Sequence, residues 1–154
     1  MTFYAYEMTL GADALPRPSI ACSPLTESLF PIYKRVYNDC FRPMRQALAL
    51  EPVDYLQSFD QIARDAEDIF LLTEGDTLIG SVSCFGNELD GLIVAETFRG
   101  RGYGRQLLLW GVEHIRQRSG GPVTLHVAAW NRKAMRLYGS AGFRVSNIEK
   151  VVRE

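Results

Sequence analysis

The segment from Arg99 to Gly104 contains the residue types best suited to bind a phosphate group. Three glycines alternate with arginines in and beside it: Gly100, Gly102 and Gly104 with Arg99, Arg101 and Arg105. Glycine permits positive φ angles and close approach to the backbone, and arginine adds positive charge. If a helix begins here, its free N–H groups and its dipole converge on one point. We therefore predict a phosphate site, with a turn that only reverses the chain as the simpler alternative.

Neighbouring positions narrow the choice of phosphate ligand. A Walker-type loop requires Gly-Lys followed by Ser or Thr at its end, and the segment lacks this. A dinucleotide-binding loop requires a third glycine where this chain has Leu107. It also requires an acidic residue after the next strand, where the chain has Ala128 and Ala129. A small nucleotide-binding protein is therefore the weakest of the functional hypotheses.

The surrounding pattern places the glycine-rich segment between a strand and a helix. Apolar residues that alternate or run together predict strands, and apolar residues at three- and four-residue spacing predict helices. The predicted strands cover residues 3–10, 19–22, 69–73, 77–85, 88–94, 123–129 and 143–149, and the predicted helices cover 27–42, 53–66, 103–119 and 132–140. The strand at 3–10 is expected at a sheet edge. Together these elements predict one mixed α/β domain spanning residues 1–154.

Composition and charge argue against several classes of protein. The chain has 154 residues, of which 47% are hydrophobic and 23% charged, as expected for one globular domain. Its 17 Lys and Arg are balanced by 18 Asp and Glu, which argues against a nucleic-acid partner. The sequence contains no signal-peptide pattern and no apolar run of about 20 residues, so no membrane association is expected.

Three cysteines, Cys22, Cys40 and Cys84, are widely spaced and form no Cys-x-x-Cys pair. Only His114 and His126 could complete a metal shell with them, so no metal site is expected. Free thiols in a reducing compartment are the simplest interpretation, and a cytoplasmic location is expected.

Two ordered motifs resemble the GNAT superfamily of N-acetyltransferases. The first is Leu92-Ile93-Val94, a four-residue link, and then Arg99-x-x-Gly102-x-Gly104. The second is Leu125-x-Val127-x-x-x-Asn131-x-x-Ala134-x-x-Leu137-Tyr138-x-x-x-Gly142-Phe143. The resemblance covers about half of the chain, from Ile69 to Phe143, and departs from the family at Glu96, where relatives often carry proline. It implies a single-domain α/β fold with a mixed, mostly antiparallel sheet flanked by helices.

The resemblance also implies a cofactor and the residues that bind it. Acetyl-CoA would be the co-substrate, with its acyl arm along the strand at 88–94 and its pyrophosphate on the glycine-rich turn. The implied cofactor-binding residues are Leu92, Ile93, Val94, Arg99, Gly100, Arg101, Gly102, Tyr103, Gly104, Arg105 and Asn131. An acyl-CoA core at about 69–149 and acceptor-side helices at about 24–66 are expected.

Catalytic roles follow from the same resemblance. Tyr138 matches the tyrosine that protonates the departing CoA thiolate, although a core tyrosine beside Phe143 is the simpler interpretation. Relatives place a carboxylate general base either on the strand before the phosphate turn or on the strand before the asparagine. Glu88 and Asp90 occupy the first place and His126 the second. We name Glu88 and His126 as candidate bases, with water or no dedicated base as the alternative.

The acceptor remains unidentified by sequence. Aromatic residues Tyr33, Tyr37, Phe41, Tyr55 and Phe59 cluster in the amino-terminal half with Arg42 and Arg45. The aromatics are core residues in the simpler interpretation; if they line a pocket, the arginines favour an acceptor with a carboxylate or phosphate, although a solvated face explains them equally well. The leading hypothesis is acetyl transfer to a primary amine of a small molecule or protein, and the alternative is a non-catalytic acyl-CoA-binding or sensing module. An unpaired strand at 3–10 makes a homodimer plausible.

Overall fold

The computed structural model describes residues 2–152 and contains a seven-stranded sheet. The strands lie in the order β2-β3-β4-β5-β6-β1-β7, and neighbours are antiparallel except β5 and β6, which are parallel. Their bounds are β1 Thr2–Leu10, β2 Ser23–Pro24, β3 Ile69–Glu74, β4 Thr77–Phe85, β5 Glu88–Val94, β6 Val123–Ala128 and β7 Arg144–Val152. The predicted class, an α/β fold with a mostly antiparallel sheet flanked by helices, is confirmed.

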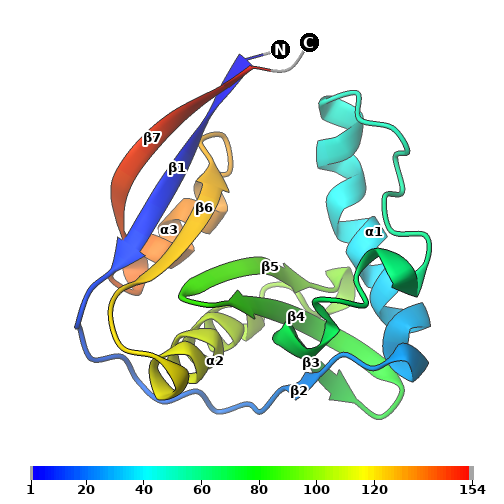
Figure 1. The fold of residues 1–154 in the computed structure, drawn as a ribbon, viewed down its shortest axis with the longest axis horizontal. Helices are drawn as coiled ribbons and strands as arrows, with labels where there is room; N and C mark the ends of the chain where they lie inside the picture. The colour runs from blue at the N-terminus through cyan, green and yellow to red at the C-terminus, as the bar shows by residue number, and fades with distance from the viewer. Residues whose placement is uncertain (1, 153–154) are drawn as a thin grey trace.

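Helices cover both faces of the sheet (Figure 1). They are α1 Phe30–Ala47, α2 Tyr103–Arg118 and α3 Arg132–Ser140. Helix α1 packs on one face, over β4 and β5, and α2 and α3 lie on the other. In Figure 1, β6, β1 and β7 rise on one side of β5 and α1 rises on the other. No helix within residues 2–152 has the length and apolar character needed to cross a membrane.

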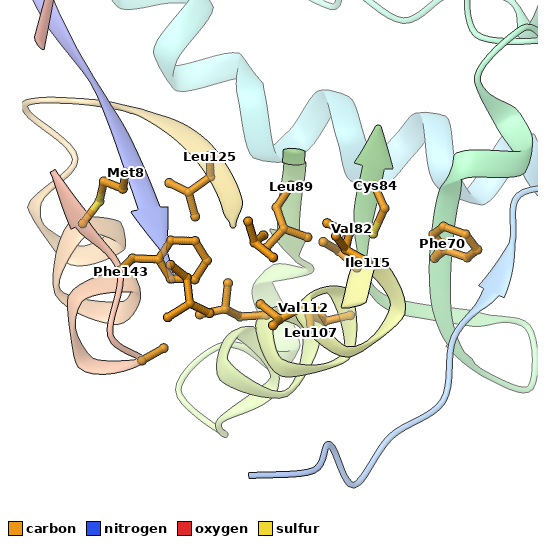
Figure 2. Close-up of a cluster of buried hydrophobic side chains, with 14 of the residues drawn as sticks. Met8, Phe70, Val82, Cys84, Leu89, Leu107, Val112, Ile115, Leu125 and Phe143 are labelled. Carbon is orange, nitrogen blue, oxygen red and sulfur yellow. The ribbon is translucent and has the colours of Figure 1, made fainter. Parts of the chain in front are cut away.

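The larger core lies between the sheet and helices α2 and α3 (Figure 2). Leu89 of β5 and Leu125 of β6 meet Leu107 and Val112 of α2 there, and Phe143 closes the cluster just before β7. Burying one such side chain contributes about 1.5 to 3 kcal/mol, so this cluster holds α2 firmly against β5. The start of α2 is thereby fixed close to the end of β5.

Strand β1 lies inside the sheet, which corrects the expectation of an amino-terminal edge strand. It pairs with β6 through Ala5–Leu10 and with β7 through Thr2–Thr9. Alternation of apolar residues predicts a strand here, but strand neighbours depend on contacts between distant parts of the chain. The edge position was the reason to consider a homodimer, so that reason no longer applies.

The amino-terminal half differs from its predicted elements in three places. Helix α1 continues through Pro43 to Ala47, because a proline near the last turn removes only one helical hydrogen bond. The helix expected at 53–66 is absent, and single turns of 3-10 helix at Phe59–Gln61 and Ala66–Asp68 replace it. The short strand expected at 19–22 lies instead at Ser23–Pro24. By contrast, the hairpin of β3 and β4 and the helices α2 and α3 agree with the predicted ranges to within about one residue.

The segment after α1 is held by one buried side chain rather than by helical bonds. Asn38 Nδ2 donates to the carbonyl oxygen of Leu56 at 2.8 Å, and the Leu56 amide donates to Asn38 Oδ1 at 3.0 Å. Both residues are buried, so no water can replace these two bonds. The side chain of Asn38 thus takes the place of a strand neighbour for Leu56.

Replacing Asn38 with alanine is expected to lower the free energy of unfolding by about 2 to 4 kcal/mol, because two buried backbone groups lose their partners. Urea unfolding followed by circular dichroism measures the change. Asn147→Ala on exposed β7 is the matched control and is expected to change stability by less than about 0.5 kcal/mol. Equal effects of the two substitutions would contradict this account of the 53–58 segment.

Candidate active site

Strands β5 and β6 separate soon after they meet. Their parallel register contains only the pairs Glu88 with Thr124 and Leu89 with Leu125. Beyond Leu89, β5 remains paired on its other side, where Ile93 and Val94 lie opposite Ser81 and Gly80 of β4. The side of β5 that faces β6 is therefore free of strand partners from Asp90 to Val94.

The glycine-rich turn lies directly beyond this free segment. Gly100 and Gly102 adopt φ angles of 76° and 86°, and no atom lies within 4 Å of the position that a Cβ would take at either residue. Gly102 is the N-cap of α2. Within residues 2–152, none of the six backbone amides from Gly100 to Arg105 donates a hydrogen bond to a protein acceptor. Unpaired amides at the positive end of a helix can bind an anion.

The arginines of the turn differ in their contacts. Arg99 turns back along β5: its Nε donates to the Val94 carbonyl oxygen at 3.1 Å, and its Nη2 lies 3.5 Å from Cys40 Sγ of α1. The guanidinium of Arg101 lies over the Phe98 ring, 5.5 Å from the centroid. Arg99 was expected to add charge around a phosphate, yet here it joins the end of β5 to α1.

Tyr138 is half-buried on α3 and lies edge-on to Phe143, with ring centroids 6.3 Å apart. Burial raises the pKa of Tyr138 above its usual value, and the negative charge of Asp90 raises it further. The phenol therefore keeps its proton at neutral pH. Asn131 Oδ1 accepts a hydrogen bond from the Ala134 amide at 3.2 Å, so Asn131 caps the helix that carries Tyr138.

His126 lies between two carboxylates on the sheet face opposite the larger core. Its Nδ1 is 2.9 Å from Glu88 Oε1, and its Nε2 is 3.6 Å from Glu7 Oε2. Glu7 belongs to β1, opposite His126 of β6, and its Oε1 accepts a hydrogen bond from Ser146 Oγ at 3.1 Å. The structure thus brings the predicted pair Glu88 and His126 together. Sequence reasoning missed Glu7, because no local signal places β1 beside β6.

Asp90 is the first residue of β5 beyond its pairing with β6. Its Oδ1 accepts a hydrogen bond from the Gly91 amide at 2.8 Å, and Gly91 has a φ of 56° where the register between β4 and β5 shifts. Asp90 is an exposed residue, yet the atoms around its carboxylate partly desolvate it and raise its pKa, and the charge of Glu88 raises the pKa further. Within residues 2–152, Asp90 forms no ion pair.

Aromatic residues of α1 lie within electrostatic reach of Asp90. The rings of Tyr33 and Tyr37 are 5.7 Å apart, and those of Tyr37 and Phe41 are 4.6 Å apart. Burial raises the pKa of Tyr37, and the charge of Asp90 is the next largest cause. Asp90 therefore lies within electrostatic reach of Tyr37 on α1 and of Tyr138 on α3.

This arrangement can bind an extended anionic ligand and move a proton. The free flank of β5 leads to the unpaired amides of the turn, while Tyr138 and Asp90 offer a proton donor and a proton acceptor beside that flank. Within residues 2–152, no three metal-ligating side chains gather in one place.

The comparisons with known proteins agree with this geometry. The sequence matches the acetyltransferase (GNAT) family over residues 30–143, and the chain belongs to that family. No curated protein matches it. Solved structures share its fold. An acetyltransferase of the GNAT family from Colwellia psychrerythraea is 14% identical, with a TM-score of 0.76 over 97% of this chain and 55% of that one.

Two further neighbours show the same fold. A GCN5-related N-acetyltransferase from Sphaerobacter thermophilus is 20% identical, with a TM-score of 0.64 over 97% of this chain and 51% of that one. A ribosomal-protein-alanine N-acetyltransferase from Brucella melitensis is 23% identical, with a TM-score of 0.64 over 81% of this chain and 85% of that one. The chain spans only 50% to 63% of the length of the first four similar structures.

Proposed function

We propose that this chain is an N-acetyltransferase that moves an acetyl group from acetyl-CoA to a primary amine. The row of unpaired amides from Gly100 to Arg105, beyond the free flank of β5, carries the proposal. Such a row suits a diphosphate. The free segment from Leu92 to Val94 suits the extended arm between the diphosphate and the thioester. Membership of the acetyltransferase (GNAT) family supports acetyl transfer in general.

The residues present fit acetyl-CoA. Open space at Gly100 and Gly102 leaves the amides accessible to a diphosphate, and Arg105 at the start of α2 adds positive charge. Gly104 presents its Cα toward Val94 and Leu137, where a Cβ would meet side-chain atoms at 3.9 and 3.6 Å. When bound, acetyl-CoA supplies an acyl group activated as a thioester. Backbone amides and a helix dipole can hold such a ligand without reorganising during the reaction.

Tyr138 is assigned the role of proton donor. Its raised pKa keeps the phenol protonated at neutral pH, and a phenol with a reference pKa of about 10 can protonate a thiolate that leaves with a pKa of about 8.5. Packing against Phe143 and the Asn131 cap hold the ring in one orientation. In this assignment Asn131 positions Tyr138 by capping α3.

Asp90 is assigned the role of proton acceptor for the attacking amine. The Nδ1 of His126 is bonded to Glu88 and its Nε2 lies 3.6 Å from Glu7, so carboxylates lie beside both ring nitrogens. Asp90 has no cation partner within residues 2–152 and lies where β5 leaves β6. Glu88 and His126, the bases named from the sequence, stay predictions, and both lie close enough to Asp90 to act on it electrostatically.

The two halves of the chain divide the task in this proposal. Residues 24–66 form the acceptor side, and residues 69–149 form the acyl-CoA side within one domain. Cys22, Cys40 and Cys84 are free thiols, which supports a reducing compartment such as the cytoplasm. The balanced net charge of −1 supports an acceptor other than nucleic acid.

Thermal unfolding with added ligands tests the proposed acetyl-CoA site. Acetyl-CoA is expected to raise the melting temperature, and ATP and NAD to raise it less. Arg105→Glu reverses the charge at the start of α2, where it repels a diphosphate, and is expected to abolish most of the rise. Arg35→Glu makes the same change at an exposed position of α1 and is expected to keep the rise. A larger rise with ATP than with acetyl-CoA would contradict the proposal.

Release of free CoA thiol across a panel of primary amines tests the reaction itself. At least one amine is expected to increase thiol release above hydrolysis, with the acetylated amine as the second product. Binding of acetyl-CoA without turnover on any amine would favour the non-catalytic acyl-CoA-binding module instead.

A further inference from the structure

Arg42 and Arg45 lie one helical turn apart on α1, but only one of them is neutralised. Arg42 Nε lies 2.8 Å from Asp54 Oδ1, and its Nη1 lies 3.1 Å from Asp39 Oδ1. With two carboxylates already on it, Arg42 is a poor anchor for a further anion. Its pKa is raised by these hydrogen bonds, as expected for a paired guanidinium.

Arg45 is held in place without a carboxylate. Its Nε donates to the Pro52 carbonyl oxygen at 3.0 Å, and its Cζ lies 5.0 Å from the centroid of the Tyr55 ring. Within residues 2–152, no acidic side chain forms an ion pair with it. Its two Nη groups are therefore left as donors on a guanidinium whose position is already fixed, which favours binding of a planar carboxylate.

A stripe of aromatic rings leads from Arg45 toward Asp90. Tyr33, Tyr37, Phe41 and Arg45 follow one another at four-residue spacing, so they share one face of α1. The charge of Asp90 raises the pKa of Tyr37, and Arg45 acts on Tyr37 in the opposite direction. Both charged groups therefore lie close enough to Tyr37 to act on it, and within residues 2–152 neither of them forms an ion pair.

We propose that the acceptor is an amine with a carboxylate at the far end of an apolar body, with its amine at Asp90 and its carboxylate on Arg45. The inference rests on the proposed function, because Asp90 is its proton acceptor. Unpaired charges of opposite sign at the two ends complement a zwitterion, and the rings between them complement an apolar body.

The length of the stripe restricts the acceptor further. Tyr37 and Arg45 are eight residues apart, which places their Cα atoms about 12 Å apart along the helix axis; because helix side chains lean toward the N-terminus, the guanidinium is nearer to Tyr37 than this. The amine and the carboxylate must therefore be separated by several bonds, unlike the α-amine and α-carboxylate of one amino acid. A second amine at the far end would meet the charge of Arg45, so a diamine is disfavoured.

A matched set of acceptors tests the proposal. The set is para-aminomethylbenzoate, benzylamine and para-xylylenediamine, which share one ring and one aminomethyl group and differ at the para position, where the diamine carries a second, equivalent amine. The wild-type protein is expected to show a kcat/KM for para-aminomethylbenzoate about 10- to 100-fold above that for benzylamine, the range of a charge-assisted hydrogen bond. The diamine is expected to be the poorest of the three.

Variants of α1 assign this preference to one side chain. Arg45→Gln is expected to bring the ratio of kcat/KM for para-aminomethylbenzoate to that for benzylamine close to 1. Arg45→Lys is expected to leave an intermediate ratio, because lysine keeps the charge but lacks the paired N–H donors of the guanidinium. Arg35→Gln removes the same charge from an exposed position of the same helix and is expected to leave the ratio unchanged. A wild-type ratio near 1, or a ratio that survives in Arg45→Gln, overturns the proposal.

A binding measurement separates this inference from the proposed function. Titration with para-methylbenzoate in the presence of CoA, followed by the side-chain Nε–H resonance of Arg45 in NMR spectra, reports anion binding without turnover. A shift of that resonance with no acetylation of any amine supports the anion site and contradicts the proposed function. Acetylation of amines with no shift leaves the proposed function standing and overturns the anion site.

Discussion

Replacing Tyr138 with phenylalanine is expected to lower kcat for acetyl transfer by about 100-fold or more, the usual contribution of a positioned general acid. The substitution removes one hydroxyl and keeps the ring that packs against Phe143, so the melting temperature should change little. Without the phenol, the thiolate must leave as an anion or take a proton from water. Release of CoA thiol under saturating acetyl-CoA and acceptor measures the effect.

The KM values and a control variant separate a catalytic role of Tyr138 from a structural one. KM for acetyl-CoA should change much less than kcat, because the hydroxyl acts on the departing group rather than on the bound ground state. Tyr4→Phe makes the same change on an exposed part of β1, where the side chain is 49% exposed, and should leave kcat unchanged. An unchanged kcat in Tyr138→Phe would show that Tyr138 is only a packing residue.

Elements with their own local signals were predictable from the sequence. Helix α2 begins after Gly102 and ends before Gly120-Gly121-Pro122, and both boundaries depend on residues within a few positions of the ends. The hairpin of β3 and β4 likewise depends on the turn at Gly75, which has a φ of 60°. The glycine-rich turn lies between such elements, so its position after β5 followed from local pattern alone.

Features that depend on distant contacts were not predictable in this way. The apolar pattern of residues 53–66 resembles a helix, but Asn38 binds the backbone of Leu56 and holds this segment in another conformation. The pattern of β1 predicts a strand without naming its neighbours, so the contact between Glu7 and His126 was not foreseen. Proline at position 43 indicates a helix end, and packing of the preceding turns overrides that signal.

The choice among the candidate bases needed the structure for the same reason. Sequence spacing places Glu88 and Asp90 on one face of β5, but the spacing does not tell which of the two carboxylates pairs with a cation. His126 lies 38 positions away from Glu88 and pairs with it only because β6 lies beside β5. Within residues 2–152, Asp90 has no cation partner, and the two strands separate just beyond Leu89.

Replacing Asp90 with asparagine is expected to lower kcat/KM about 100-fold or more for strongly basic amines at neutral pH, because the variant cannot accept the proton of the amine. Weakly basic acceptors such as methoxyamine are already neutral at this pH, so their kcat/KM should fall less. In the wild-type protein kcat/KM should decrease as the pH falls through the pKa of Asp90, which lies above the usual carboxyl value of 3.8. Asp90→Asn should remove that limb of the pH profile.

The same raised pKa predicts the opposite effect of Asp90→Asn on stability. A carboxyl group whose pKa is higher in the folded than in the unfolded state stabilises the fold below the unfolded pKa, and this contribution is lost as the pH rises through the folded pKa. At neutral pH ionised Asp90 therefore destabilises the fold, and Asp90→Asn should raise the melting temperature there more than at low pH. Loss of activity together with a gain in stability distinguishes a functional carboxylate from a structural one. If Asp90→Asn lowers both the activity and the melting temperature, the pKa of Asp90 is not raised, and Glu88 becomes the base to test next.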